Sequence, residues 1–292
     1  MPTLPLPERE SHQHRRAAES FGADAARYDR ARPRYPDALV EAVVAAGPGR
    51  DLLDVGIGTG ISARPFRAAG CTVLGVDADP RMAAFARHDG FDAEVAAFEA
   101  WDPAGRTFDT VVAGQTWHWI DPVAGAAKAA RVLRPGGRLA VFWNVFRPSP
   151  ATAGAFSAVY RCVLPDSPLN PWAGPVAQAY EGLFAKAADG IRQAGAFGEP
   201  QQWRFDWERR YTREEWLDQL RTGGDAGRIP PDRFEELLAG FGAAVDALGG
   251  AFTMPFTSVV VTAALAGTGP SGPSVSSEAS SPSEPEDTAA VR

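Results

Sequence analysis

The sequence predicts an α/β fold built on a doubly wound, mainly parallel sheet. Three observations support this prediction: short apolar strands alternate with helical stretches, an acidic strand end at Asp54 leads into a glycine-rich turn, and Asp-Pro pairs begin two of the helices. A strand–helix–strand order gives parallel neighbours with a helix crossing between them. The chain has 292 residues, which fits one domain with tails better than two independent domains.

The first five strands are predicted at 51–55, 72–76, 93–97, 109–113 and 137–144, and a helix at 61–69 follows the first of them. At 79–80 and at 121–122 an aspartate precedes a proline, which places a capping carboxylate before the first helical turn. The Arg-Pro-Gly-Gly sequence at 134–137 is expected to end a helix at 122–133 and to turn into the fifth strand.

The last third of the chain contains two extended runs, at 201–211 and 252–264. Thr212 and Glu215 have the spacing of a capping box, which predicts a helix, and a second helix is expected from about 232 to 248. Prolines between 148 and 175 predict loops, followed by a helix near 176–194, so that 146–200 forms a cap over a pocket. Residues 1–16 and 267–292 are predicted to be disordered tails around a domain at 17–266.

Composition argues against several classes of function. The net charge is −7 and the only basic block is Arg15-Arg16, so a nucleic acid is not the expected partner. Two cysteines are too few for a disulfide framework or a thiolate metal site, and no bound metal is expected. Because no apolar run approaches the length of a membrane span and no signal peptide is apparent, we expect a cytoplasmic protein with no membrane partner.

The glycine-rich turn is the most informative motif. Asp54, Gly56, Gly58 and Gly60 occupy alternate positions after two aliphatic residues. Positions without side chains let a ligand lie against the backbone. The nicotinamide fingerprint requires a third glycine where this chain has Ile61. The pattern instead resembles motif I of the class I S-adenosylmethionine-dependent methyltransferases.

Further motifs stand in the order of that family: Gly-Val-Asp at 75–77, Phe-Glu at 98–99, Phe-Asp at 108–109, Gln-Thr-Trp-His at 115–118, and an N-terminal segment at 21–36. The resemblance covers about 20–265 and implies a seven-stranded, Rossmann-like sheet with an antiparallel last strand. It also implies S-adenosylmethionine as cofactor. The cofactor-binding residues that it implies are Tyr28, Arg32, Asp54, Gly56, Gly58, Gly60, Asp77, Met82, Phe98, Glu99, Gly114 and Gln115.

Two of these assignments have alternatives in which the residue has only a structural role. Met82 is as compatible with core packing as with contact to the adenine ring. Arg32 is as compatible with surface solvation as with pairing to the carboxylate of the cofactor.

His118 is the only histidine near the expected pocket. It is a candidate to deprotonate or orient the methyl acceptor, and the alternative is a histidine that fixes its loop. Trp117, Trp119 and Trp143 are expected either to wall the acceptor pocket or to pack in the core, and Asn144 is a candidate to orient an acceptor oxygen.

The sequence therefore predicts a methyltransferase that acts on a small molecule, with oxygen favoured as the methylated atom. The alternatives are a protein that binds S-adenosylmethionine without turnover and, less favoured, an oxidoreductase with a nucleotide cofactor. The identity of the acceptor and the oligomeric state do not follow from the sequence.

Overall fold

The computed structural model describes residues 20–167, 170–174, 176–224 and 229–266. The tails predicted to be disordered, at 1–16 and 267–292, lie outside these residues.

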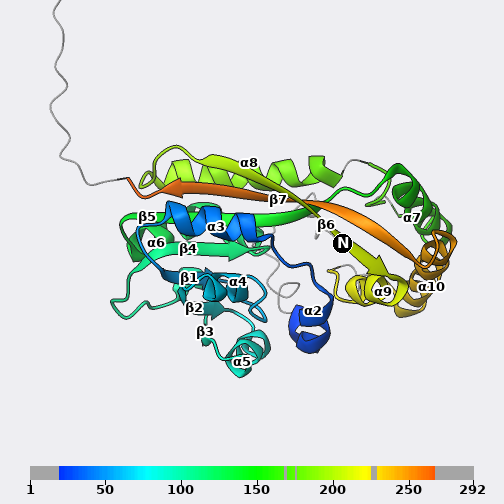
Figure 1. Cartoon of the computed structure of the whole chain (residues 1–292), viewed down its shortest axis with the longest axis horizontal. Helices are drawn as coiled ribbons and strands as arrows, with labels where there is room; N and C mark the ends of the chain where they lie inside the picture. The colour runs from blue at the N-terminus through cyan, green and yellow to red at the C-terminus, as the bar shows by residue number, and fades with distance from the viewer. Residues whose placement is uncertain (1–19, 168–169, 175, 225–228, 267–292) are drawn as a thin grey trace, which may run out of the picture.

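Seven strands form one sheet in the order β3-β2-β1-β4-β5-β7-β6 (Figure 1). Neighbouring strands from β3 to β5 are parallel, whereas β7 runs antiparallel to both β5 and β6. This arrangement confirms the predicted doubly wound sheet. The strands are β1 (Asp51–Val55), β2 (Thr72–Asp77), β3 (Asp92–Val95), β4 (Phe108–Gly114), β5 (Leu133–Phe146), β6 (Gln201–Thr212) and β7 (Ala251–Ala264).

Helices cover both faces of the sheet. Leu52 and Leu53, adjacent on β1, belong to two different buried clusters because successive side chains of a strand point to opposite faces. Leu52 packs with the cluster of α3, α4 and α5, and Leu53 with the cluster of α6 and α8. These helices are α3 (Asp37–Ala46), α4 (Ala63–Ala68), α5 (Pro80–His88), α6 (Pro122–Val132) and α8 (Val176–Ala194).

Three further helices, α7 (Pro150–Val163), α9 (Arg213–Arg221) and α10 (Pro231–Ala247), gather at one end of the sheet, on the right of Figure 1. Their contact is an aromatic cluster in which Phe156 lies 5.4 Å from Trp216 and 5.2 Å from Phe241, measured between ring centroids. The prediction of loops around 150 is wrong. Ser149 caps α7 by accepting a hydrogen bond from the Thr152 amide, and Pro150 occupies the first turn.

The helix caps that the sequence predicts are present. Asp79 accepts a hydrogen bond from the Arg81 amide at the start of α5, and Asp121 accepts from two amides at the start of α6. Thr212 and Glu215 form both hydrogen bonds of the capping box that opens α9. The 134–137 sequence differs from its prediction: β5 begins at Leu133, and the pairing register shifts between Phe108 and Thr110 to accommodate the turn.

The strand order reverses between β1 and β4: the chain continues from β1 to β2 and β3 on one side, and from β4 to β5 on the other. Ligands of doubly wound sheets bind outside the carboxyl ends of the strands at such a point. The short segments η2 (Ser20–Asp24), α2 (Ala25–Ala31), η3 (Phe98–Ala100) and η4 (Trp117–Trp119) complete the fold, and α2 lies against α5 and α9 near this edge (Figure 1).

Candidate active site

A cavity opens at the carboxyl ends of β1, β2, β4 and β5, where the strand order reverses. The cavity brings together most of the residues that the sequence predicts for a site. Those that line it are Tyr28, Arg32, Gly56, Gly58, Asp77, Met82, Phe98, Glu99, Gly114, Gln115, His118, Trp119 and Asn144. Asp54, Gly60, Trp117 and Trp143 are not among the lining residues.

The glycines of the turn after β1 share a left-handed backbone but differ in surroundings, with φ values of +70° at Gly56, +57° at Gly58 and +89° at Gly60. A Cβ atom at Gly56 would lie 2.1 Å from the Thr116 side chain, and one at Gly60 would lie 2.9 Å from the Phe91 ring. A Cβ at Gly58 would meet only the Gly56 carbonyl oxygen, at 4.0 Å. Gly56 and Gly60 therefore permit close packing, whereas Gly58 leaves open space on the cavity wall.

Asp77, at the end of β2, is held against the glycine turn. Its carboxylate accepts a 2.8 Å hydrogen bond from the Gly58 amide and another of 2.8 Å from the Asp79 amide. Burial raises the pKa of Asp77, although both amide bonds oppose that shift. The adjacent Asp79 behaves differently: burial alone would raise its pKa, but hydrogen bonds from Arg81 outweigh burial and hold the pKa below its usual value.

Asp54 lies beneath the turn and is fully buried. The Ser62 hydroxyl donates a 2.6 Å hydrogen bond to its Oδ2 atom, while Oδ1 has no hydrogen-bond partner among the described residues. Burial raises the pKa of Asp54 to about 7, and the nearby Asp77 carboxylate adds to the shift. The structure thus places Asp54 as a support for the turn rather than on the cavity wall.

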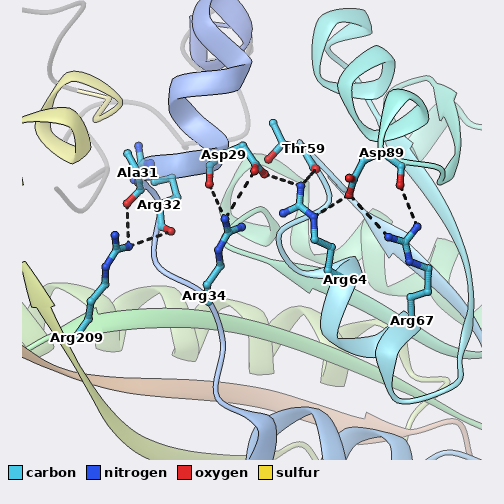
Figure 2. Close-up of polar contacts among 9 residues, drawn as sticks. All are labelled: Asp29, Ala31, Arg32, Arg34, Thr59, Arg64, Arg67, Asp89 and Arg209. Carbon is cyan, nitrogen blue, oxygen red and sulfur yellow. Dashed lines mark hydrogen bonds and ion pairs between the residues drawn. The ribbon is translucent and has the colours of Figure 1, made fainter. Parts of the chain in front are cut away.

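The N-terminal segment is fixed over the glycine turn by arginine contacts (Figure 2). Arg64, on α4, donates hydrogen bonds to the Asp29 carboxylate at 2.7 Å, to the Asp89 carboxylate at 2.8 Å and to the Thr59 carbonyl at 3.0 Å. On the other side, Arg209 donates to the Ala31 carbonyl at 3.1 Å. These bonds connect α2 to α4, to the end of α5 and to β6.

This anchoring places Tyr28 and Arg32 on the cavity wall. The Arg32 guanidinium lies 4.8 Å from the centroid of the Tyr28 ring and donates a hydrogen bond to the Thr222 carbonyl. Arg32 is half-buried, so the alternative of a freely solvated surface arginine does not apply.

At the ends of β2 and β3 the wall becomes apolar. Met82 and Phe98 are buried to 5% and 3% exposure, yet both contribute to the cavity surface. Core packing and contact with the cavity are therefore compatible for Met82. Glu99 accepts a 3.3 Å hydrogen bond from the Asp121 amide, which ties η3 to the start of α6.

The end of β4 carries an unusual backbone conformation. Gln115 has a φ of +55°, and its amide donates a 2.8 Å hydrogen bond to the Phe142 carbonyl on β5. Left-handed backbone at a residue with a side chain is uncommon and is often found at functional sites. Its side chain forms a hydrogen bond with Tyr180 of α8, a residue whose pKa is raised, mainly by burial. Sheet and helix α8 are thereby connected across the cavity.

The aromatic segment after β4 divides between cavity and core. His118 and Trp119 line the cavity, with ring centroids 4.8 Å apart. Trp117 and Trp143 are only 2% and 1% exposed and belong to the core, the second of the two roles that the sequence allowed. Trp143 nevertheless contributes to the site, because its indole N–H donates a 3.2 Å hydrogen bond to Nδ1 of His118. Burial lowers the pKa of His118 to about 4.

Asn144 is buried at the end of β5 and joins three segments. Its amide nitrogen donates to the Arg34 carbonyl at 3.0 Å, and its amide oxygen accepts from the Ser258 hydroxyl at 2.6 Å. The side chain fixes the N-terminal segment to the sheet as well as contributing to the cavity wall.

Several wall residues were not identified from the sequence. They come from positions far apart in the chain. Apart from Tyr35, which lies in the N-terminal motif at 21–36, their isolated aromatic, aliphatic or amide side chains carry no local motif. Only the amphipathic pattern of α8 could have suggested that one of its faces is buried. These residues are Tyr35, Phe146, Tyr180, Leu183, Gln219 and Phe256. Three of them, Phe146, Tyr180 and Leu183, come from the segment expected to form a cap.

Among the described residues, no group of three or more histidine, cysteine, aspartate or glutamate side chains is arranged to hold a metal ion. Within the same residues, no helix combines the length and the apolar character that crossing a bilayer requires.

Comparison with known proteins finds methyltransferases. The family described as "Methyltransferase domain" matches residues 53–141, from β1 into β5. An uncharacterized methyltransferase of Mycobacterium tuberculosis is 36% identical over 127 residues, which is 43% of this chain and 52% of the relative. Another, from Schizosaccharomyces pombe, is 25% identical over 75% of this chain and 84% of the relative.

The match to the mycobacterial protein thus spans about half of its length. A solved structure from Anaeromyxobacter dehalogenans, provisionally named a type II methyltransferase, aligns over 79% of this chain and 97% of its own, with a TM-score of 0.57 and 24% identity. This likeness supports the fold. The matched domain contains the glycine turn, Asp77 and the β4 segment of the cavity. Residues 53–141 thus match a methyltransferase domain, and the fold around them is similar to that of a methyltransferase structure.

Proposed function

We propose that this protein transfers a methyl group from S-adenosylmethionine to an oxygen atom of a small molecule. The observation that carries the proposal is the pairing of Gly58 and Asp77 on one wall of the cavity. The Gly58 amide donates to Asp77, and the missing side chain of Gly58 leaves the adjacent space open.

The wall residues fit the cofactor. A carboxylate at the end of the second strand can accept hydrogen bonds from both ribose hydroxyls, which is the role proposed for Asp77. The apolar side chains of Met82 and Phe98 provide surfaces for the adenine ring, beside Glu99. Tyr28 and Arg32 are the candidates for the methionyl carboxylate, because guanidinium groups bind carboxylates with charge-assisted hydrogen bonds.

When bound, S-adenosylmethionine supplies a methyl group already activated on a sulfonium sulfur. The protein has to align the acceptor with this methyl group and to exclude water, since correct placement accounts for a large share of such rate accelerations. The fixed N-terminal segment and α8 enclose the cavity and suit this task. His118, Trp119 and Asn144 are the proposed acceptor-side residues, with Trp143 acting through His118.

Two alternatives remain distinct from this proposal. An oxidoreductase with a nicotinamide cofactor is disfavoured because Ile61 lines the cavity where the fingerprint requires glycine. A binding protein without turnover would keep Gly58 and Asp77 but would bind the acceptor no more tightly in the transition state than in the ground state.

Calorimetric titration with S-adenosylhomocysteine, with a nicotinamide dinucleotide as the control ligand, tests the proposal. We expect binding of the first ligand in the micromolar range and no heat from the second. Binding of the dinucleotide alone would overturn the cofactor assignment. If S-adenosylhomocysteine binds, an acceptor screen with a radiolabelled methyl group separates the enzyme from the binding protein without turnover.

A further inference from the structure

His118 lies between a core tryptophan and the cavity. Trp143, on β5, is 1% exposed, and its ring packs 5.4 Å from the ring of Phe184 on α8. From this fixed position its Nε1–H donates to Nδ1 of His118 over 3.2 Å. His118 itself lines the cavity, and its Nε2 atom is buried with no hydrogen-bond partner among the described residues.

The direction of this hydrogen bond determines the form of the imidazole. An indole nitrogen can only donate, so Nδ1 of His118 has to be the acceptor and carries no proton. A neutral imidazole has one protonated nitrogen, and the proton is therefore on Nε2. The low pKa of about 4 that burial gives His118 keeps the ring neutral at physiological pH. An Nε2–H group is a hydrogen-bond donor and has no lone pair with which to take a proton.

We propose that Trp143 holds His118 as a hydrogen-bond donor, and that His118 uses Nε2–H to bind an oxygen of the methyl acceptor rather than to deprotonate it. The missing partner of the buried Nε2–H is then the acceptor oxygen, because an unpaired buried donor is unfavourable and a ligand that pairs with it gains affinity. His118 is the catalytic residue in this arrangement, and Trp143 is a positioning residue. The proposal rests on the methyltransferase function proposed above.

A donor at this position selects an acceptor whose oxygen arrives without a proton, and a carboxylate fits this chemistry. The carboxylates on the cavity wall are Asp77, Asp79 and Glu99, and they come from the β2 end, the α5 cap and η3. The opposite side, formed by η4, β5, α8 and the residue after β4, contributes His118, Asn144, Tyr180 and Gln115, although the family resemblance assigns Gln115 to the cofactor. Tyr180 is a poor base because burial raises its pKa. Among the described residues, the acceptor side of the wall therefore presents neutral polar groups and no carboxylate that would repel an anion.

The transfer balances without a base. An oxygen of the carboxylate forms a bond to the methyl carbon while the bond from that carbon to the sulfonium sulfur breaks. The electron pair of the broken bond remains on sulfur, which becomes a neutral thioether. The acceptor becomes a neutral methyl ester, and no proton is released.

Access to Nε2 requires a side chain to move, because this atom is closed to water in the structure. Trp119 contacts the His118 ring, at 4.8 Å between centroids, and lines the cavity, so we expect its side chain to be the one that moves. Displacement of the Trp119 ring by the acceptor would open Nε2 while keeping water away from the new hydrogen bond. A hydrogen bond formed in such a dry environment is stronger than one in water.

Nitrogen NMR of the imidazole tests the protonation state without any activity. The full chain, labelled with ¹⁵N-histidine, is measured at pH 7, and the spectrum of His118→Gln identifies the His118 signals among those of the four histidines. We expect a neutral ring with the proton on Nε2. In Trp143→Phe, which keeps an aromatic ring but lacks the donor, the signals should move toward a mixture of the two tautomers. A proton on Nδ1, or a charged ring, in the wild-type protein overturns the proposal.

Turnover of carboxylates tests the role of the donor. Glutamine can place an N–H group close to the position of Nε2 but cannot act as a base, so His118→Gln should keep kcat within about tenfold of the wild type. His118→Ala should lose about 10–100-fold, the loss expected for one hydrogen bond to a charged group. Equal losses in both variants would overturn the donor role.

A panel of small carboxylic acids, each paired with its matching alcohol, tests the acceptor class. Methyl ester formation with acids and no ether formation with alcohols supports the proposal, and the reverse preference overturns it. If S-adenosylhomocysteine does not bind at all, the methyltransferase function fails, whereas the NMR result still decides the state of His118.

Discussion

The two halves of the cavity differ in how the chain builds them. The half formed by the ends of β1, β2 and β3 comes from residues 55–99, and its polar groups are backbone amides, Thr59 and the carboxylates of Asp77, Asp79 and Glu99. The half formed by β4, β5 and their neighbours draws on η4, α8, α9 and β7, and its polar groups are amides, hydroxyls and an imidazole.

The difference follows from the ligands proposed for each half. A cofactor shared across the family requires the same contacts, and a short strand–turn–helix unit can provide all of them. An acceptor that differs between enzymes is surrounded by side chains from separate helices and strands. These side chains can be substituted one at a time. The comparison predicts that substitutions in the first half act on cofactor affinity and those in the second half on the acceptor.

Gly58→Val is expected to have the largest effect. Its side chain would enter the open space on the cavity wall. We expect the affinity for S-adenosylhomocysteine to fall by more than about 100-fold, or roughly 3 kcal/mol, measured by calorimetry.

Gly136→Val is the matched control for this variant. Gly136 has a φ of +75°, against +57° at Gly58, and a Cβ there meets nothing within 4 Å, so the backbone strain is similar while the cavity is untouched. Gly136→Val should keep its affinity for the ligand. Loss of affinity in both variants would show that strain, rather than contact with the cofactor, is responsible.

Asp77→Asn should have the next largest effect. An amide keeps an oxygen for only one of the Gly58 and Asp79 amides. It loses the charge, and its NH2 group cannot accept from the other backbone amide or from a ribose hydroxyl. We expect about 10–100-fold weaker binding of S-adenosylhomocysteine, because hydrogen bonds to a charged group contribute roughly 1.5–3 kcal/mol. An unchanged dissociation constant, with the fold intact by circular dichroism, would remove Asp77 from the cofactor site.

The first half of the cavity was largely predictable from the sequence, because its signals are local. The alternating glycines, the acidic strand ends and the Asp-Pro caps each specify a backbone conformation within a few residues. The same locality explains why the capping box of α9 was predicted correctly. What the sequence did not reveal is the difference between the glycines, because that depends on Thr116 and Phe91, which are distant in the chain.

In the second half of the cavity, the sequence predicted only the residues that lie at or directly after the ends of β4 and β5. Tyr180, Leu183, Gln219 and Phe256 reach the cavity through tertiary packing, which no local pattern encodes. The roles of Trp143 and His118 depend on a contact between β5 and η4 and could not be separated from simple core packing. Helix α7 was missed because Pro150 was interpreted as a loop residue, although proline is also favoured in the first turn of a helix.

The Asp54→Asn variant tests the role of Asp54 in supporting the glycine turn, and the quantity measured is the free energy of unfolding. The pKa of Asp54 is about 7 in the folded protein, against an ordinary value of 3.8, so the folded state holds a proton that the unfolded state releases. Stability therefore falls as pH rises from about 4 to 7, and the full cost is present above pH 7. The shift corresponds to at most about 4 kcal/mol.

Because the asparagine leaves one buried polar atom unpaired, we expect a smaller gain of about 1–2 kcal/mol in unfolding free energy at pH 8, measured by chemical denaturation. Near pH 4 the unfolding free energies of the variant and the wild type should become equal. Asp79→Asn provides the contrast, because the pKa of Asp79 is lowered and removal of its charge should destabilise the protein at pH 8. A loss of stability in Asp54→Asn at pH 8 would contradict the raised pKa of Asp54.

Tyr180→Phe should have the smallest effect and the most selective one. It removes only the hydroxyl that bonds to Gln115 across the cavity and leaves the buried ring in place. One neutral hydrogen bond contributes about 0.5–1.5 kcal/mol, so the KM for the best carboxylate of the acceptor panel should rise by up to about tenfold. Affinity for S-adenosylhomocysteine should not change, because α8 belongs to the acceptor half.

Tyr160→Phe is the control variant. Tyr160 is a buried residue of α7 that does not line the cavity, so its substitution should change neither the KM nor the affinity. If Tyr180→Phe instead weakened cofactor binding and left KM unchanged, the division of the cavity would have to be redrawn, with Gln115 and α8 assigned to the cofactor half.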